Sequence, residues 1–363
     1  MAPNPLQQLP DLGQAVWLDS IRRSYLEPDG YLPRLIRARE VQGLTSNPSI
    51  FEKALGDDHS YDEQLSELHG SDPRDALWSI MKTDVRDACD LFLPLYDDSD
   101  GRHGQVSIEL DPGNAFDTEE SFTKGLALFS ELDRPNLMVK VPGTEAGLAA
   151  VPRLLAEGVN VNITLLFSVA RYEAVIAAYF DGLRQRAEAS GDLRRLSSVA
   201  SFFVSRVDSK VDAVLGPDHP RLATAAVANA RAAYGSFQRA FDGPQWAELA
   251  DLGAQVQRPL WASTSTKDPS YRDVIYVEQL AGPDTVNTMP ESTMDAVRDH
   301  GVIEDRLSGA GEQARRQLQR LAEDGVDLDQ VTKELETEGV EKFVASFEAA
   351  TETVRQHITE RDQ

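Results

Sequence analysis

Short apolar runs and longer amphipathic stretches follow one another along this chain. Each apolar run is about four to eight residues long, which is typical of a buried β-strand, and the stretches between them have apolar residues at helical spacing. A polar turn is expected at Asn47 and Pro48. The pattern predicts eight strands, at 16–19, 41–48, 105–110, 137–142, 159–164, 198–203, 259–263 and 285–289. It predicts helices at 31–39, 60–69, 73–96, 118–132, 148–155, 168–189, 220–241, 291–300, 311–324, 328–337 and 340–358.

Eight strands separated by helices in one uninterrupted series indicate a (β/α)8 barrel, so the fold class we predict is an α/β TIM barrel. We expect the whole chain, residues 1–363, to form a single domain with 291–363 as a helical C-terminal extension. A doubly wound open sheet is the structural alternative. No Gly-x-Gly-x-x-Gly turn follows the first strand, which counts against a dinucleotide-binding fold.

The chain is strongly acidic, with a formal charge of −24 over 363 residues. This charge argues against nucleic acid and anionic membrane as partners, because both would be repelled. A phosphorylated substrate would also be repelled at long range, so its site needs a local cluster of cations.

Other features favour a cytoplasmic protein without a metal site. The first residues lack the basic and apolar regions of a signal peptide, and no apolar run approaches membrane-spanning length. The single cysteine, Cys89, shares a predicted helix face with Val85 and Phe92, so we expect it in the core. It cannot form a disulfide within the chain, which fits a reducing compartment. The histidines are scattered without ligand spacing.

A lysine stands in the middle of the apolar run Leu137–Pro142. Lysine is rarely buried without a partner, and only eight of the 36 basic residues in this chain are lysines. Burial disfavours the ammonium and so favours the free amine, which can form a Schiff base with a carbonyl substrate. The alternative is a strand-end lysine whose flexible stem carries the charge to solvent. Lys140 is therefore a candidate nucleophile.

Chemically useful residues lie near the end of each predicted strand. In a barrel the C-terminal strand ends meet at one mouth, where the active sites of this fold lie. Taken singly, each residue is more often a turn former. Together they provide an amine, two carboxylates, and several amides and hydroxyls, which suits amine catalysis on a polyhydroxy carbonyl compound. They are Asp19, Asn47, Glu109, Lys140, Asn162, Thr164, Ser201, Ser263 and Thr288.

Four segments resemble signatures of the transaldolase family. They are Gly43–Phe51 (GLTSNPSIF), Val139–Leu148 (VKVPGTEAGL), Asn162–Ser168 (NITLLFS) and Ser201–Arg206 (SFFVSR). The resemblance runs from about residue 19 to residue 289, and the length of the chain resembles the longer bacterial subfamily. It implies an enzyme of the pentose phosphate pathway that needs no metal or organic cofactor. The implied reaction moves a dihydroxyacetone unit from sedoheptulose 7-phosphate to glyceraldehyde 3-phosphate and gives erythrose 4-phosphate and fructose 6-phosphate.

The resemblance also implies catalytic roles. Lys140 would be the Schiff-base lysine, and Glu109 would move protons through a water held with Thr164. Asp19 would be the acid/base for the hydroxyl whose deprotonation breaks the carbon–carbon bond.

Substrate-binding roles follow in the same way. Asn47, Asn162 and Ser201 would hold the dihydroxyacetone unit, and Arg206 would bind the phosphate. The better-known subfamily has an arginine after the seventh-strand serine, where this chain has a polar segment ending in Lys267. Lys267 is therefore a candidate second cation. The alternative for both cations is pairing with surface carboxylates.

Two other functions remain open at this point. A Schiff-base aldolase would cleave a sugar phosphate and release the fragment to water, and product analysis with and without an acceptor aldehyde separates it from a transaldolase. A non-catalytic sugar-phosphate-binding barrel would bind without turnover, and the presence of Lys140, Glu109 and Asp19 argues against it. The sequence leaves open whether the protein is a monomer or a homodimer, and what the C-terminal extension does.

Overall fold

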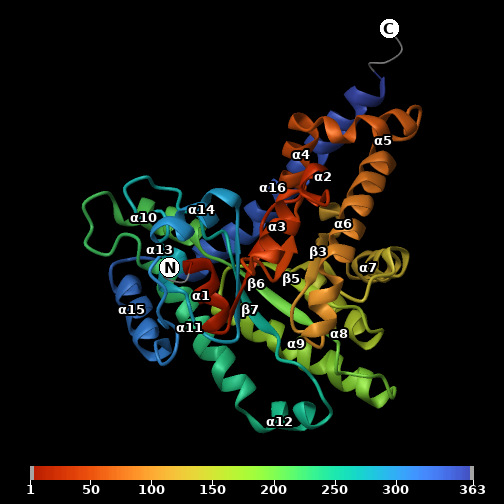
Figure 1. Ribbon diagram of the computed structural model, residues 1–363. Coiled ribbons are helices and arrows are strands. Elements are labelled where there is room, and N and C mark those ends of the chain that lie inside the picture. Colours follow the sequence, from red (N-terminus) through yellow and green to blue (C-terminus); the bar gives the residue numbers. More distant parts are fainter. Residues whose placement is uncertain (1–3, 360–363) are drawn as a thin grey trace.

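The computed structural model describes residues 4–359. Eight parallel strands form a closed barrel in which each strand pairs with the next and β8 pairs with β1 (Figure 1). The predicted (β/α)8 barrel is confirmed, and the β1–β8 pairing excludes an open sheet. The strands are β1 Gln14–Leu18, β2 Gly43–Thr45, β3 Gln105–Glu109, β4 Leu137–Pro142, β5 Val161–Leu166, β6 Ser198–Phe203, β7 Arg258–Ala262 and β8 Thr285–Met289.

All strand residues are buried, which explains why the strands appear in the sequence as apolar runs. Helices cover a parallel barrel on the outside and side chains fill its inside, so neither face of the sheet meets solvent. The register places Glu109 of β3 opposite Lys140 of β4, and Lys140 opposite Asn162 of β5. These three residues therefore lie beside one another across neighbouring strands.

Helices follow the strands around the barrel, and several begin at a capping side chain, such as Asp117 before α7 and Thr144 before α8. No helix within residues 4–359 has an apolar stretch long enough to cross a membrane. The longer helices are α6 Pro73–Asp98, α7 Thr118–Leu132, α8 Glu145–Ala156, α9 Val169–Glu188, α10 Ser205–Leu215, α11 Ala225–Phe241, α14 Glu291–His300, α15 Gly311–Glu323 and α16 Leu328–Thr359. The remaining helical elements are α1 Pro5–Asp11, α2 Arg23–Leu26, α3 Tyr31–Arg37, α4 Pro48–Asp57, α5 Asp62–Glu67, α12 Pro244–Asp251, α13 Ile275–Gln279 and the 3₁₀ turns η1 His59–Tyr61 and η2 Pro112–Asn114.

The segment after β2 is a helix, α4, where we predicted a polar turn. Asn47 is its N-cap residue, because the side-chain Oδ1 accepts a hydrogen bond of 3.1 Å from the backbone N–H of Ile50. Pro48 occupies the first helical position, where a missing N–H costs nothing. The helix predicted at 220–241 is also corrected, since α11 begins only at Ala225.

The C-terminal segment forms one long helix, α16, where we predicted two helices at 328–337 and 340–358. α16 is continuous through Gly339. A Cβ atom at Gly339 would lie 3.0 Å from Leu165 Cδ2, so the glycine lets the helix approach the end of β5 closely. The helix also packs against α4, α6 and α10, so it runs beside the C-terminal ends of the strands (Figure 1).

Candidate active site

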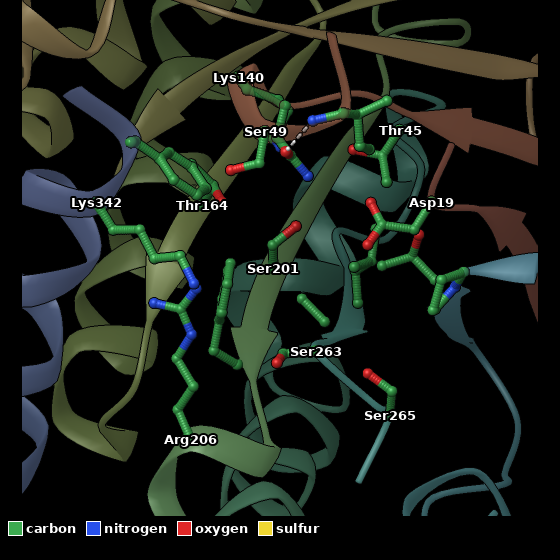
Figure 2. Close-up of a pocket in the computed structure, with 18 of the residues that line it drawn as sticks. Asp19, Thr45, Ser49, Lys140, Thr164, Ser201, Arg206, Ser263, Ser265 and Lys342 are labelled. Carbon is green, nitrogen blue, oxygen red and sulfur yellow. Dashed lines mark hydrogen bonds between the residues drawn. The ribbon is translucent and has the colours of Figure 1, made fainter. Parts of the chain in front are cut away.

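A cavity of about 260 Å³ opens at the C-terminal ends of the strands. Hydroxyl and charged side chains from many strand ends converge on it (Figure 2). Two predicted site residues, Glu109 and Asn162, do not line the cavity but contact residues that do. The other predicted site residues all line it: Asp19, Asn47, Lys140, Thr164, Ser201, Arg206 and Lys267.

Lys140 contacts a carboxylate and a backbone carbonyl inside the barrel. The residue is only 4% exposed. Its Nζ lies 2.8 Å from Glu109 Oε2 and donates a hydrogen bond of 2.9 Å to the carbonyl oxygen of Ser46. The alternative of a lysine that reaches solvent is therefore wrong. The structure shows that Glu109 forms an ion pair with Lys140, which the pattern of strands in the sequence did not predict.

Both predicted catalytic carboxyls have raised pKa values. Burial raises the pKa of Glu109, against the smaller opposing effect of Lys140. Asp19 keeps part of its surface open to the cavity, and desolvation raises its pKa against the attraction of nearby lysines, Lys140 first among them. A carboxylate with a raised pKa is a better proton acceptor. Glu109 is therefore placed, 2.8 Å from Lys140 Nζ, where a proton can pass between the carboxylate and the amine nitrogen.

A chain of hydrogen bonds fixes the amide of Asn162. Ser201 Oγ donates to Asn162 Oδ1 at 2.6 Å, and Asn162 Nδ2 donates to Ser107 Oγ at 3.0 Å. Thr164, two residues later on β5, has a buried Oγ1 without a hydrogen-bond partner in the described part of the chain. The fixed amide of Asn162 orients the Ser201 hydroxyl at the cavity wall, and the Thr164 hydroxyl can still bind a ligand.

Positive side chains line the outer part of the cavity. Arg206 and Lys342 form no hydrogen bond or ion pair within residues 4–359, and Figure 2 shows both on the side of the cavity facing away from Asp19. Lys267 donates to Ser265 Oγ at 3.1 Å. The cations are Lys53, Arg206, Lys267 and Lys342.

Within residues 4–359 none of these four cations forms an ion pair with a carboxylate, and the like charges repel one another. Asp268, next to Lys267 in sequence, instead accepts hydrogen bonds from Ser270. Burial lowers the pKa of Arg206. Burial also lowers the pKa of Lys267, and the like charges of Arg206 and Lys342 lower it further. Crowded, partly desolvated cations favour an anion between them. Such a cluster is the local feature that an acidic protein needs to bind a phosphate.

The cavity is also lined by side chains that the sequence analysis did not propose as site residues, among them Lys53, Lys342 and Phe343. The position of Lys53 could have been predicted, because an asparagine followed by proline, here Asn47 and Pro48, is typical of the start of a helix. Such a helix begins at the edge of the cavity and contains Lys53. Lys342 and Phe343 lie on α16, and no local pattern indicates that this helix returns to the second strand.

The structure also bears on the metal and cysteine predictions. No group of three or more His, Cys, Asp or Glu side chains in the described range, 4–359, is arranged to hold a metal ion. Cys89 is buried in α6, as predicted, and burial raises the pKa of its thiol.

Comparisons with known proteins agree with one another. A family described as "Transaldolase/Fructose-6-phosphate aldolase" matches residues 16–354. A protein named transaldolase from Acidothermus cellulolyticus is 51% identical over 351 residues, which cover 95% of this chain and 94% of that protein. Proteins of the same name from Parafrankia sp. and Mycolicibacterium paratuberculosis are each 48% identical, over 98% of both chains.

Proposed function

The chain belongs to the family of transaldolases and fructose-6-phosphate aldolases, and we propose that its cavity is the active site of a transaldolase. The enzyme transfers a dihydroxyacetone unit from sedoheptulose 7-phosphate to glyceraldehyde 3-phosphate, and erythrose 4-phosphate and fructose 6-phosphate are formed. The observation that carries this proposal is the buried pair of Lys140 and Glu109 beside a cavity that Asp19 also lines. Schiff-base chemistry needs these groups: an amine, a proton acceptor in contact with it, and a second acid/base.

The first step is imine formation on Lys140. Glu109, 2.8 Å away, accepts the ammonium proton, and the free amine attacks the C2 carbonyl carbon of the ketose. The resulting carbinolamine loses its hydroxyl as water once that oxygen has received a proton. Glu109 supplies this proton through a water held with Thr164, whose Oγ1 has no hydrogen-bond partner among residues 4–359.

The second step is cleavage and transfer. Asp19 takes the proton of the C4 hydroxyl, the C3–C4 bond breaks, and its electron pair moves into the iminium as an aldehyde phosphate leaves. The acceptor aldehyde then enters, the bond forms in reverse, and Asp19 returns its proton. A raised pKa suits Asp19 to both directions, because it must gain and lose a proton in each cycle.

The dihydroxyacetone unit is held by Asn47 and Ser201, and Asn162 acts on it through Ser201. Asn162 lies behind the cavity wall, and its 2.6 Å hydrogen bond with Ser201 fixes the Ser201 hydroxyl that faces the substrate. Asn47 Oδ1 caps α4, which leaves the amide nitrogen of Asn47 free to donate to a substrate hydroxyl.

The phosphate is bound by Arg206 and Lys267, with Lys53 and Lys342 nearby. Arginine can donate two parallel hydrogen bonds to phosphate, so Arg206 is the main contact. The protein has a formal net charge of −24, and this cluster of cations makes the electrostatic potential in the cavity attractive to an anion.

Arg206→Ala is expected to raise the Michaelis constant for phosphorylated substrates far more than for their unphosphorylated counterparts. A charge-assisted phosphate contact is lost, which is worth roughly 1.5–3 kcal/mol, or about 10- to 100-fold in binding. Lys267→Ala should show the same selectivity more weakly, while Lys333→Ala, at an exposed position of α16, should have none. Equal damage to both substrate classes would show that Arg206 is structural.

Borohydride trapping tests the proposed function directly. Reduction in the presence of fructose 6-phosphate should attach a three-carbon adduct to the protein, and peptide mass spectrometry should locate it on Lys140. An adduct elsewhere, or none, would contradict the Schiff-base mechanism.

Product analysis then separates transfer from simple cleavage. With fructose 6-phosphate and erythrose 4-phosphate, sedoheptulose 7-phosphate should form much faster than free dihydroxyacetone. Rapid release of dihydroxyacetone without an acceptor would instead identify an aldolase, the second activity that the family description contains. Binding without either product would identify a non-catalytic barrel.

The partners we propose are sugar phosphates, with no nucleic acid or membrane. The net charge of −24 and the cation-lined cavity support small anionic substrates. We also propose a cytoplasmic location, which the single buried cysteine supports.

A further inference from the structure

The C-terminal helix α16 places an aromatic ring against the reactive amine. Phe343 lines the cavity and is only 5% exposed. Its ring centroid lies 5.9 Å from Lys140 Nζ. The amine is therefore bounded by Glu109, by the Ser46 carbonyl and by the apolar ring of Phe343.

A stripe of residues at four-residue spacing holds this ring in place. Gly339, one turn before Phe343, allows the close approach to Leu165 at the end of β5. Phe347, one turn after, packs on Trp78 with 5.7 Å between ring centroids. Residues four apart share a helix face, so these contacts anchor the helix on both sides of Phe343.

Transfer requires that the three-carbon fragment stay on Lys140 after the first aldehyde has left. The fragment then carries the electron pair of the broken bond as an enamine. Its release needs a proton on C3 and then water on C2, after which the C–N bond breaks and dihydroxyacetone and the Lys140 amine are formed. At this stage the outer cavity has lost the aldehyde that filled it, so solvent must be kept out by the protein.

We propose that α16, through Phe343, shields this enamine from solvent and so makes the enzyme a transferase rather than an aldolase. The inference rests on the proposed function. An apolar ring near the amine can neither give a proton to C3 nor orient a water toward C2, whereas Glu109 can still serve the hydrolysis that frees the finished ketose. The helix α16 is then part of the active site.

Phe343→Ala and Phe343→Leu test this shield. The quantity to measure is the rate of free dihydroxyacetone formation from fructose 6-phosphate, divided by the rate of transfer to saturating erythrose 4-phosphate. We expect the ratio to rise about tenfold or more in Phe343→Ala, because the barrier to release falls relative to the barrier to transfer. Phe343→Leu keeps an apolar cover and should stay near the wild-type ratio. A change in stability alone would scale both rates together and leave the ratio unchanged.

Two further variants make the test independent of Phe343 itself. Gly339→Val should also raise the ratio, because its side chain would push α16 away from Leu165, whereas Lys333→Ala, at an exposed position of the same helix, should not. An unchanged ratio in Phe343→Ala, or an equal rise in Lys333→Ala, would overturn the shield. Borohydride capture on Lys140 of the wild-type protein tests the proposed function separately, so the two ideas can fail independently.

Discussion

Lys140→Arg is expected to abolish transaldolase activity while leaving the protein folded. The guanidinium keeps the positive charge beside Glu109 but cannot form an imine with a ketone. The whole covalent route is lost rather than one proton transfer within it, so the rate should fall by more than about 10⁴-fold, the upper end of a single acid–base contribution. The measurement is the steady-state rate of sedoheptulose 7-phosphate formation from fructose 6-phosphate and erythrose 4-phosphate.

The matched control for this substitution is Lys333→Arg, at an exposed position of α16. It makes the same chemical change outside the cavity and should keep full activity. Circular dichroism and thermal unfolding should show that both variants are folded. Appreciable turnover by a folded Lys140→Arg protein would rule out Schiff-base catalysis at this lysine.

Asp19→Asn and Glu109→Gln are expected to reduce activity by about 10²- to 10⁴-fold each, at different steps. Asp19→Asn removes the proposed acceptor of the C4 hydroxyl proton, so the imine should form but its carbon–carbon bond should not break. Glu109→Gln removes the proton acceptor in contact with Lys140, so imine formation itself should become slow.

Borohydride trapping rates distinguish these two defects. Asp19→Asn should trap the whole six-carbon sugar at close to the wild-type rate, because cleavage is blocked after the imine has formed. Glu109→Gln should trap slowly, and the adduct that does form should have three carbons. Equal trapping rates in the two variants would mean that the assigned roles are incorrect.

The strands were predictable from the sequence because the barrel buries them completely. Each strand appears in the sequence as a short apolar run, and the residues at the end of the run lie at the C-terminal mouth of the barrel. The predicted strand boundaries differ from the observed ones where the backbone is irregular. The fifth strand was predicted at 159–164, but β5 extends to Leu166 through an irregular register in which Leu165 has a φ of +61°. Apolar periodicity does not reveal such an irregularity.

The parts of the site that sequence reasoning missed depend on tertiary packing. The pairing of Glu109 with Lys140 follows from the register between β3 and β4, which no local pattern encodes. Lys342 and Phe343 reach the cavity because α16 packs against α4 and β5. An amphipathic pattern predicts that a helix has a buried face but does not say which part of the fold covers it.

The barrel can close only late in synthesis, because its first and last strands pair with each other. Gln14 of β1 bonds to Thr285 of β8, 271 positions later, so the first strand waits with an open edge until the eighth has been made. Contacts this distant in sequence form slowly, and nascent chains fold from the N-terminus as they emerge. Lys140 and its carboxylates are thus synthesised well before the barrel that holds them can close. Phe343 is added after β8, so a ribosome-bound chain that has just closed its barrel still lacks the ring that lies 5.9 Å from Lys140 Nζ in the finished protein.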